Sequence, residues 1–211
     1  MYDKLSELGV RQSALLGETL KQRLPRIDRV VRGSHVRHRD TAEACLAALG
    51  TDATVTVDAR WDEYDGRELI ERYNAWYRRR WLLQLDMART GNPRRAFQDM
   101  FDKALDRWLR GGDGYRESFE AFSARACGAL GELGGSLGSD QTALVFTSGG
   151  PISAVAADLL GGGPDTWLRL NRVCVNASLT KVVLGRRGST LVTYNDHSHF
   201  EAEGRELLTY R

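Results

Sequence analysis

The chain has 211 residues, of which 42% are hydrophobic and 27% charged, and its formal net charge at pH 7 is +2. A chain of this size and composition can bury a globular core, and its mild charge argues against nucleic acid as the main partner. The three cysteines, Cys45, Cys127 and Cys174, are widely spaced, which excludes a disulfide framework and a zinc ribbon and indicates buried thiols. No leader pattern and no apolar run of ~18 residues occurs, so we expect a cytoplasmic protein with no membrane partner.

The chain is expected to begin with a helix and a strand. Ser6 has the character of a helix N-cap, the leucines between positions 8 and 24 form one apolar stripe, and Pro25 ends the helix. The β-branched run at 27–31 then predicts a strand. A further short strand is expected at 53–57, where apolar and polar residues alternate.

Arg37 lies where the strand at 27–31 gives way to a loop at Gly33-Ser34 and then to a helical repeat ending at Leu49. In an open α/β sheet, ligands bind beyond the carboxyl ends of the strands. The rigid fork of donors on an arginine suits a phosphate or a carboxylate at such a place. The alternative is a surface arginine that caps a helix, and the local sequence favours neither interpretation.

An acidic loop is expected at 61–66, with the sequence WDEYDG. Glu63 is its candidate general acid, because a phosphate ester is cleaved faster when the leaving oxygen is protonated. A carboxyl group beside an aromatic side chain such as Tyr64 can have its pKa raised enough to supply that proton. The alternative is that the carboxylates of this loop are simply solvated.

Two helices are expected between residues 67 and 110, separated by Gly91-Asn92-Pro93 and ended by Gly111-Gly112. Their apolar stripes are Leu69, Tyr73, Trp76, Leu83 and Met87 in the first and Phe97, Phe101, Leu105 and Trp108 in the second. The run WYRRRW at 76–81 offers a different interpretation, a single-stranded nucleic acid site built from charge and stacking. Basic residues on the outer face of helices are usually just solvated.

A second anion element is expected after a further helix at 115–133 and a glycine-rich exit loop at 134–138. The apolar strand 143–146 runs through Thr147-Ser148-Gly149-Gly150 into a helix with Pro151 in its first turn. The free amides and the positive dipole end of such a helix attract an anion. Ser148 could donate a hydrogen bond to a phosphate oxygen there.

The chain is expected to end with a hairpin of strands 173–184 and 189–194, turning at 186–188. His197 and His199 follow it at the spacing of two residues on one face of a strand. Two imidazoles could ligate one ion, but no further ligand lies nearby in sequence, so we expect no metal.

Four segments in order along the chain resemble the histidine phosphatase (phosphoglycerate mutase-like) superfamily. Residues 5–12, LSELGVRQ, resemble its L-T-x-x-G-x-x-Q helix start, and residues 34–43, SHVRHRDTAE, resemble its S-x-x-R-A-x-Q-T-A block. Residues 63–66, EYDG, resemble its acidic loop, and residues 144–152, LVFTSGGPI, resemble its element in which a strand leads through S-H-G-G into a helix. Four such blocks, spread over nearly the whole chain, form a specific signal.

Two departures from the family pattern concern its histidines. The family's nucleophile is the histidine of an N-terminal R-H-G strand, roughly ten or more residues before the L-T-x-x-G helix, whereas only residues 1–4 precede Leu5 here. The family's second histidine aligns with Ser148. We therefore expect no R-H-G strand and no histidine at either catalytic position, with His35 and His38 the only histidines nearby. The absent strand would leave a gap in the sheet beside strand 143–146.

The resemblance implies a three-layer α/β/α fold with a mostly parallel sheet, as a single domain over 1–211 with a helical cap insertion at about 67–111. It also implies phosphomonoester hydrolysis through phosphohistidine, in which arginine clamps the phosphoryl group and a carboxylic acid protonates the leaving group. The expected catalytic residues are Glu63 and Arg37, and the expected substrate-binding residues are Arg37, Ser34, Ser148, Gly149 and Gly150.

We therefore expect a phosphatase-like protein whose turnover is impaired by the absent nucleophile strand. Whether this chain is an active enzyme is an open question at this point. One alternative is a non-catalytic member that binds a phosphorylated ligand or a partner protein, and a weaker one is a nucleic-acid binder that uses the Arg/Trp-rich cap. The expected partner is phosphate or a phosphorylated small molecule, without nucleic acid, cofactor or metal. A homodimer that pairs across the gap in the sheet is a further expectation.

Overall fold

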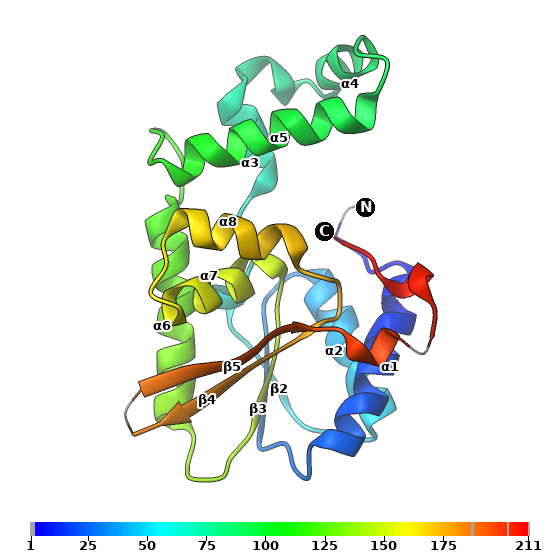
Figure 1. Ribbon diagram of the computed structural model, residues 1–211, viewed down its shortest axis with the longest axis vertical. Coiled ribbons are helices and arrows are strands. Elements are labelled where there is room, and N and C mark those ends of the chain that lie inside the picture. The colour runs from blue at the N-terminus through cyan, green and yellow to red at the C-terminus, as the bar shows by residue number, and fades with distance from the viewer. Residues whose placement is uncertain (1–2, 187, 202, 211) are drawn as a thin grey trace. The chain divides into compact units, whose positions relative to one another are not determined.

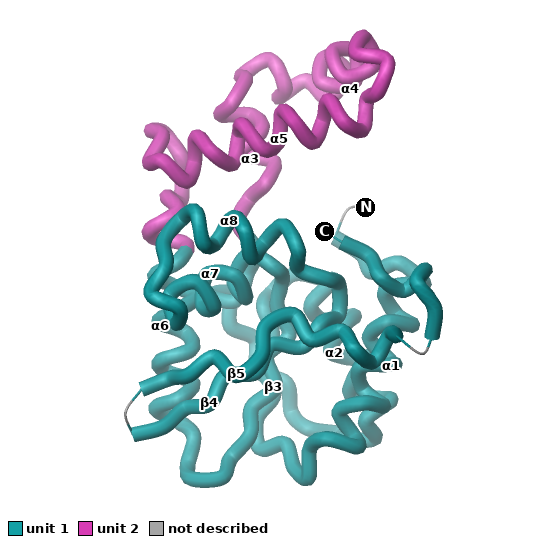
Figure 2. Tube along the Cα trace, in the orientation of Figure 1, with its two compact units in different colours: residues 1–63, 123–211 teal, residues 64–122 magenta. Residues whose placement is uncertain are grey.

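A computed structural model describes residues 3–186, 188–201 and 203–210. The chain divides into two compact units, shown in Figure 2. Unit 1 comprises residues 1–63 and 123–211, and unit 2 comprises residues 64–122. Within the described ranges, no helix is long and apolar enough to cross a membrane.

Unit 1 contains a parallel sheet with the strand order β2-β1-β3 (Figure 1). Its strands are β1 (Arg29–Arg32), β2 (Val55–Val57) and β3 (Ala143–Phe146). In the register of the sheet, Val30 of β1 lies beside Val55 and Leu144. The predicted bounds of β3 are confirmed, whereas β1 begins two residues later than predicted. Because the strands are parallel, the segments that follow β1 and β3 emerge at the same edge of the sheet.

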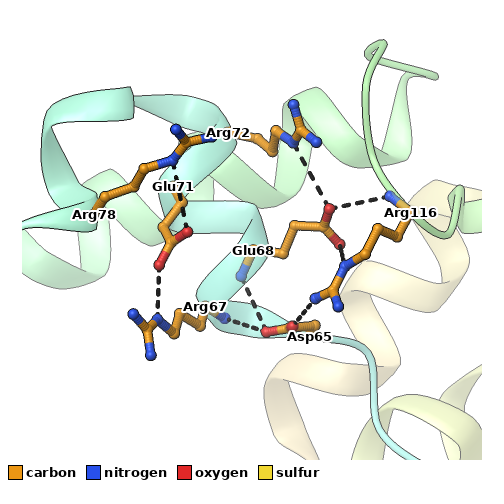
Figure 3. Close-up of a pocket in the computed structure, with 7 residues that line it drawn as sticks. All are labelled: Asp65, Arg67, Glu68, Glu71, Arg72, Arg78 and Arg116. Atoms are coloured by element: carbon orange, nitrogen blue, oxygen red, sulfur yellow. Dashed lines mark hydrogen bonds and ion pairs between the residues drawn. The ribbon is translucent and has the colours of Figure 1, made fainter.

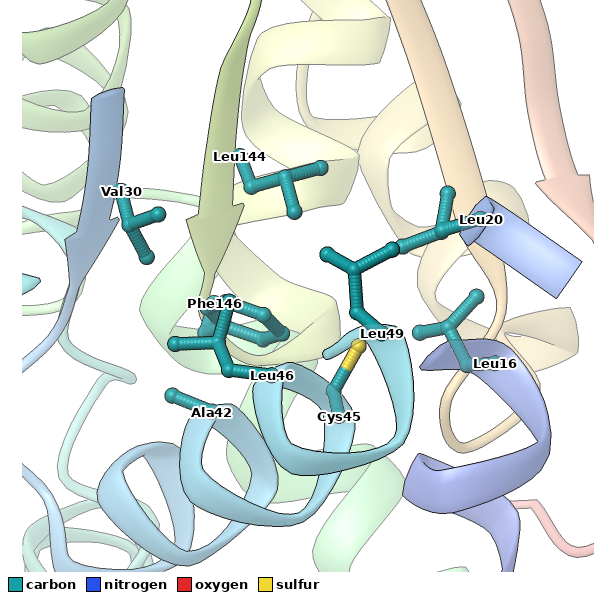
Figure 4. Packing of buried hydrophobic residues seen from close by; sticks show 9 residues of the cluster. All are labelled: Leu16, Leu20, Val30, Ala42, Cys45, Leu46, Leu49, Leu144 and Phe146. Carbon is teal, nitrogen blue, oxygen red and sulfur yellow. The ribbon is translucent and has the colours of Figure 1, made fainter. Parts of the chain in front are cut away.

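Helices α1 (Glu7–Arg23) and α2 (Val36–Leu49) pack against each other and form one layer beside the sheet (Figure 1). The Oγ atom of Ser6 accepts a hydrogen bond from the Gly9 amide at 3.1 Å, which confirms the predicted N-cap. Gly17 allows the close approach, because a Cβ atom there would lie 2.2 Å from the Cys45 carbonyl oxygen. The buried cluster between these helices and the sheet, shown in Figure 4, is Leu16, Leu20, Val30, Ala42, Cys45, Leu46, Leu49, Leu144 and Phe146.

Of the remaining elements of unit 1, η1 (Ala59–Trp61) and α6 (Phe119–Ser136) precede β3 along the chain and the others follow it, and the first residues of α6 belong to unit 2. The others are α7 (Gly149–Leu159), α8 (Pro164–Val173), β4 (Leu179–Gly185), β5 (Gly188–Asp196), η3 (Ser198–Phe200) and η4 (Arg205–Leu207). Figure 1 shows α6 on the opposite side of the parallel strands from α1 and α2. Helix α7 packs on α8, where the fully buried Trp167 donates its Nε1 hydrogen to the Gly150 carbonyl at 3.0 Å.

The prediction of a strand over 173–184 is wrong at its start. Val173 ends α8, a helix that the sequence pattern did not predict. Ala177 has a φ angle of 55°, which interrupts extended backbone, and β4 therefore begins only at Leu179. Residue 187 of the predicted hairpin turn lies outside the described residues. The helix predicted at 115–133 is shifted and runs from Phe119 to Ser136.

The two sheets of unit 1 are separate, because β4 and β5 pair only with each other among the described strands. Strand β3 is consequently an edge strand of the parallel sheet. The carbonyls of Thr142 and Phe146 accept hydrogen bonds from the segment of β1, so Ala143 and Val145 direct their backbone groups to the unpaired edge.

Unit 2 is helical, with α3 (Gly66–Tyr73), η2 (Ala75–Arg78), α4 (Arg80–Ala88) and α5 (Pro93–Leu109). The prediction of one helix before Gly91 is wrong, because the Asn74 side chain accepts a hydrogen bond from the Trp76 amide and starts a new turn. Trp76 is 68% exposed and does not belong to the buried face. The aromatic core of this unit is Tyr64, Trp108, Phe119 and Phe122.

Candidate anion-binding site

Arg37 lies in the first turn of α2, just beyond the loop that follows β1, at the junction where the sequence placed it. Its Nη1 atom donates to Oδ1 of Asp3 at 2.9 Å. Its Nε and Nη2 atoms each lie 3.3 Å from Oγ of Ser148, which follows β3. The guanidinium therefore joins the segments that leave β1 and β3 at their carboxyl ends.

The carboxylate of Asp3 occupies the start of α2. Its second oxygen accepts a hydrogen bond from the Val36 amide at 2.9 Å, while the first binds Arg37. Burial acts to raise the pKa of Asp3, but the Val36 amide and the Arg37 charge outweigh it and hold the pKa below its usual value. The helix start and the arginine thus already bind one anionic group.

His38 is the main site residue that the sequence reasoning missed. Its Nε2 atom lies 2.6 Å from Oγ of Ser148, and its ring is only 2% exposed. Burial, followed by the positive charge of Arg37, lowers the pKa of His38 to about 3, so the imidazole is neutral at pH 7. The sequence carries a signal for this difference, because position 38 is a histidine in this chain and an alanine in the family's S-x-x-R-A-x-Q-T-A block.

The second ring nitrogen of His38 faces Asp62. Nδ1 has no hydrogen-bond partner among the described residues and lies 3.7 Å from Oδ1 of Asp62. Ser34 holds this carboxylate with its amide, at 2.5 Å, and with its hydroxyl. Gly33 makes room for the pair, because a Cβ atom there would lie 2.2 Å from Nδ1 of His38 and 2.6 Å from Oδ1 of Asp62.

Helix α7 begins directly after Ser148, whose side chain makes no capping hydrogen bond to the helix. Pro151 lies in its first turn, which confirms the predicted turn from strand to helix. The buried Glu63 accepts a hydrogen bond from the Gly150 amide at 3.2 Å, so its carboxylate lies at the positive end of the helix.

The structure thus gathers the predicted site residues at the carboxyl edge of the sheet in unit 1. Ser148 contacts Arg37, and Glu63 accepts a hydrogen bond from the Gly150 amide. Gly149, which lies between Ser148 and Gly150 in the chain, is the first residue of α7. Ser34 donates a hydrogen bond to the Asp62 carboxylate, and this carboxylate lies beside the His38 ring of the site. The arrangement offers one guanidinium, one helix N-terminus, one neutral imidazole and one buried carboxyl group to a ligand.

A separate pocket within unit 2 is lined only by charged side chains, Asp65, Arg67, Glu68, Glu71, Arg72, Arg78 and Arg116 (Figure 3). Glu68 pairs with Arg72 and Arg116, and Glu71 pairs with Arg67 and Arg78. Arg116 also pairs with Asp65, so every lining side chain has a partner of opposite charge, although the four arginines outnumber the three acidic residues by one. None of the predicted site residues lines this pocket.

The two histidines near the end of the chain contact backbone carbonyls. Nδ1 of His197 lies 2.7 Å from the Asn195 oxygen, and Nε2 of His199 lies 3.1 Å from the Ala177 oxygen. In the part of the chain that the structure describes, no group of three or more His, Cys, Asp or Glu residues is arranged to hold a metal ion.

The chain has an α/β fold with a candidate anion site at the carboxyl ends of parallel strands. A sequence model of the histidine phosphatase superfamily (branch 1) matches residues 3–197. The chain belongs to this superfamily, as its sequence blocks predicted. No curated protein sequence matches the chain.

Solved structures confirm the predicted α/β fold with its parallel sheet, which matches the phosphoglycerate mutase-like fold. A phosphoserine phosphatase mutant from Entamoeba histolytica, in complex with phosphoserine, has a TM-score of 0.65 at 16% identity, with 93% of this chain and 86% of that chain covered. A mycobacterial glucosyl-3-phosphoglycerate phosphatase in complex with inorganic phosphate has a TM-score of 0.60 at 22% identity, covering 93% and 89%. The α-ribazole phosphatase from Shigella flexneri has a TM-score of 0.59 at 17% identity, covering 91% and 84%.

Proposed function

We propose that this protein binds a phosphorylated small molecule between Arg37, Ser148 and the N-terminus of α7, and that its reaction class is phosphomonoester hydrolysis. One observation carries the proposal. The guanidinium of Arg37 holds the Asp3 carboxylate and at the same time contacts Ser148 at the start of α7. Membership of the histidine phosphatase superfamily and the phosphate and phosphoserine complexes of the similar structures support it.

Each element of the site has a role in this proposal. Arg37 clamps two phosphoryl oxygens, and the first amides of α7 stabilise the charge that develops on a third. The buried carboxyl group of Glu63 protonates the leaving oxygen. Unit 2, which follows Glu63 in the chain, is the insertion that selects the substrate.

We infer that the residue at position 148 impairs turnover through phosphohistidine. Ser148 stands at the position of the family's second histidine. A serine lacks the positive charge that an imidazolium contributes to phosphate binding. His38 contacts Ser148 from α2, but its own pKa is low and it does not supply that charge at pH 7.

Calorimetric titration with phosphate or vanadate tests the proposed site. A charged hydrogen-bonded pair is worth about 1.5–3 kcal/mol, so Arg37→Ala should weaken phosphate binding by roughly ten- to a hundredfold. The matched control is Arg39→Ala, two residues along the same helix, where the side chain is exposed and pairs with Asp40. Equal phosphate binding by the parent chain and by Arg37→Ala would refute the proposal.

A non-catalytic role is the second candidate function, and Ser148 is the observation that favours it. In that case the protein binds phosphorylated ligands through the same residues without cleaving them. Tight discrimination among phosphorylated small molecules, with no release of phosphate from any of them, would identify this role.

The weaker candidate is nucleic-acid binding by unit 2. Trp76 and Trp81 are 68% and 58% exposed within a segment that also carries Arg78, Arg79 and Arg80. Binding of a single strand through these side chains should fall steeply as salt is added. Binding of a ligand at the phosphate site should depend on Arg37 instead.

We further propose a cytoplasmic location, supported by three cysteines that are all free thiols.

A further inference from the structure

The hydroxyl of Ser148 is contacted by two side chains of α2. Its Oγ atom lies 2.6 Å from Nε2 of His38 and 3.3 Å from both Nε and Nη2 of Arg37. A guanidinium carries only donors, so the Arg37 nitrogens donate to Oγ. The serine side chain makes no capping bond to α7. The direction of the hydroxyl hydrogen is therefore set by what the His38 ring presents to it.

The imidazole of His38 carries its single hydrogen on Nε2. The ring is neutral at pH 7 and only 2% exposed, so this hydrogen has no access to bulk water. Nδ1 has no hydrogen-bond partner among the described residues, because Oδ1 of Asp62 lies 3.7 Å away, beyond hydrogen-bonding distance. A hydrogen on Nδ1 would thus be a buried donor without an acceptor, which folded proteins rarely contain. A hydrogen on Nε2 meets Oγ of Ser148 at a heavy-atom distance of 2.6 Å.

The ring of His38 is held in this orientation by its neighbours. It packs against the backbone of Gly33, where a Cβ atom would lie 2.2 Å from Nδ1 and 2.8 Å from Cε1. The ring of His35 meets it edge to face, with 5.1 Å between the ring centroids and an angle of 72° between the planes. These contacts leave the ring little freedom to turn, so Nε2 stays directed at Ser148.

The hydroxyl hydrogen of Ser148 is consequently left for a ligand. A hydroxyl has two lone pairs and one hydrogen. Arg37 donates to one lone pair and His38 to the other, and no described acceptor contacts the hydrogen. The serine directly precedes α7, whose first amides also present hydrogens. The guanidinium, the hydroxyl and these amides are then all donors, which suits a phosphoryl group because its oxygens only accept.

We propose that His38 is a positioning residue that makes the Ser148 hydroxyl a hydrogen-bond donor to a phosphoryl oxygen. This inference rests on the proposed function and deepens it, because it assigns the contact that a serine makes where the family has its second histidine. Both positions depart from the family blocks together, since those blocks have alanine at position 38 and histidine at position 148. The phosphoryl oxygen thereby meets a neutral donor. The inference assigns no nucleophile and no proton transfer to this pair.

Calorimetric titration of the full chain with inorganic phosphate at neutral pH tests the inference through a cycle of variants. His38→Phe keeps a buried ring but removes its hydrogen-bond donor, and it should raise the Kd for phosphate roughly three- to tenfold. Ser148→Ala should raise the Kd by a similar factor. Adding His38→Phe to Ser148→Ala should then change the Kd by less than about twofold, because His38 acts only through the hydroxyl.

Conservative variants separate this role from a purely structural one. His38→Gln can carry an amide N–H to the position of Nε2 and should recover most of the affinity. His38→Asn carries its amide at the position of Nδ1 and should bind phosphate more weakly than His38→Gln. This second contrast decides the question if His38→Phe does not fold, which urea unfolding of each variant shows. The matched control is His199→Phe, which removes an imidazole that contacts the Ala177 carbonyl outside the site.

The outcomes distinguish the inference from the function beneath it. If His38→Phe binds phosphate as tightly as the parent chain, or if the two single effects multiply in the double variant, the inference is wrong. The same holds if His38→Gln and His38→Asn bind phosphate equally. The proposed function still stands in these cases, provided that Arg37→Ala weakens binding. If the parent chain binds no phosphate, both fail.

Discussion

His38 and Ser148 are 110 residues apart in the chain, yet Nε2 of the first lies 2.6 Å from Oγ of the second. The contact joins the first turn of α2 to the residue that precedes α7. It forms because β1 and β3 are parallel neighbours, so that the segments leaving them meet at one edge of the sheet. The serine and the histidine thus lie together beside Arg37 in the candidate site.

Acid should destabilise the parent chain more than a His38→Gln variant. The folded chain keeps His38 neutral down to a pKa of about 3, whereas an unfolded histidine takes up a proton near its ordinary value of 6.5. Between these values the unfolded state binds more protons, so the free energy of unfolding falls as the pH falls, by about 1.4 kcal/mol per pH unit from this residue. Urea unfolding of both chains at neutral pH and near pH 5 measures the difference. Equal losses of stability on acidification would show that the burial of His38 does not control its protonation.

Two glycine substitutions should change stability in opposite directions. Gly17→Ala places a methyl group 2.2 Å from the Cys45 carbonyl, so α1 and α2 must separate, at a cost of about 1–3 kcal/mol. Gly131→Ala lies in α6, where the added methyl group meets no atom within 4 Å, and helix propensity predicts a gain of about 0.5–1 kcal/mol. Chemical unfolding of the two variants measures both effects. A stable Gly17→Ala chain would contradict the packing of these helices.

Removing the Asp3 carboxylate should strengthen phosphate binding. Asp3 competes for Arg37 and for the Val36 amide, and its side chain is 39% exposed, so Asp3→Asn should lower the Kd for phosphate by roughly two- to fivefold. Glu43→Gln is the matched control, because it removes the same charge from an exposed side chain of α2. Calorimetric titration measures all three chains. An unchanged or higher Kd for Asp3→Asn would mean that Asp3 does not occupy the anion site.

The unpaired edge of β3 should be visible in hydrogen exchange. The amides of Ala143 and Val145 face that edge and should exchange faster than those of Leu144 and Phe146, which face β1.

We propose that a homodimer covers this edge, because an unpaired strand is a template for a second chain. In that case the protection of Ala143 and Val145 should rise with protein concentration, together with the sedimentation coefficient. Full protection in a dilute monomer would contradict the open edge.

Local sequence signals were sufficient to predict much of the fold. Ser6 predicted the start of α1, the apolar run ALVF predicted β3 with its bounds, and Pro151 predicted the start of α7. Each prediction depends only on residues within one turn or strand. Helix α8 was not predicted, and the positive φ angle of Ala177 was not predicted either, because an alanine carries no signal for that conformation.

The site was only partly predictable, because its contacts join distant segments. Arg37, Glu63 and Ser148 could be selected from family blocks and helix-start chemistry. The role of Asp3 could not, because its partner Val36 lies 33 residues away and the folding of α1 brings the two together. The contact of His38 with Ser148 likewise depends on the register of β1 against β3, which no local pattern fixes.

The most direct test of the phosphate site is a crystal structure of the full chain grown with vanadate. We expect vanadate within hydrogen-bonding distance of Arg37 and of the amides of Gly149 and Gly150, with the Asp3 carboxylate displaced from the guanidinium. Vanadate bound in the charged pocket of unit 2, or no vanadate beside Arg37 at a saturating concentration, would contradict it.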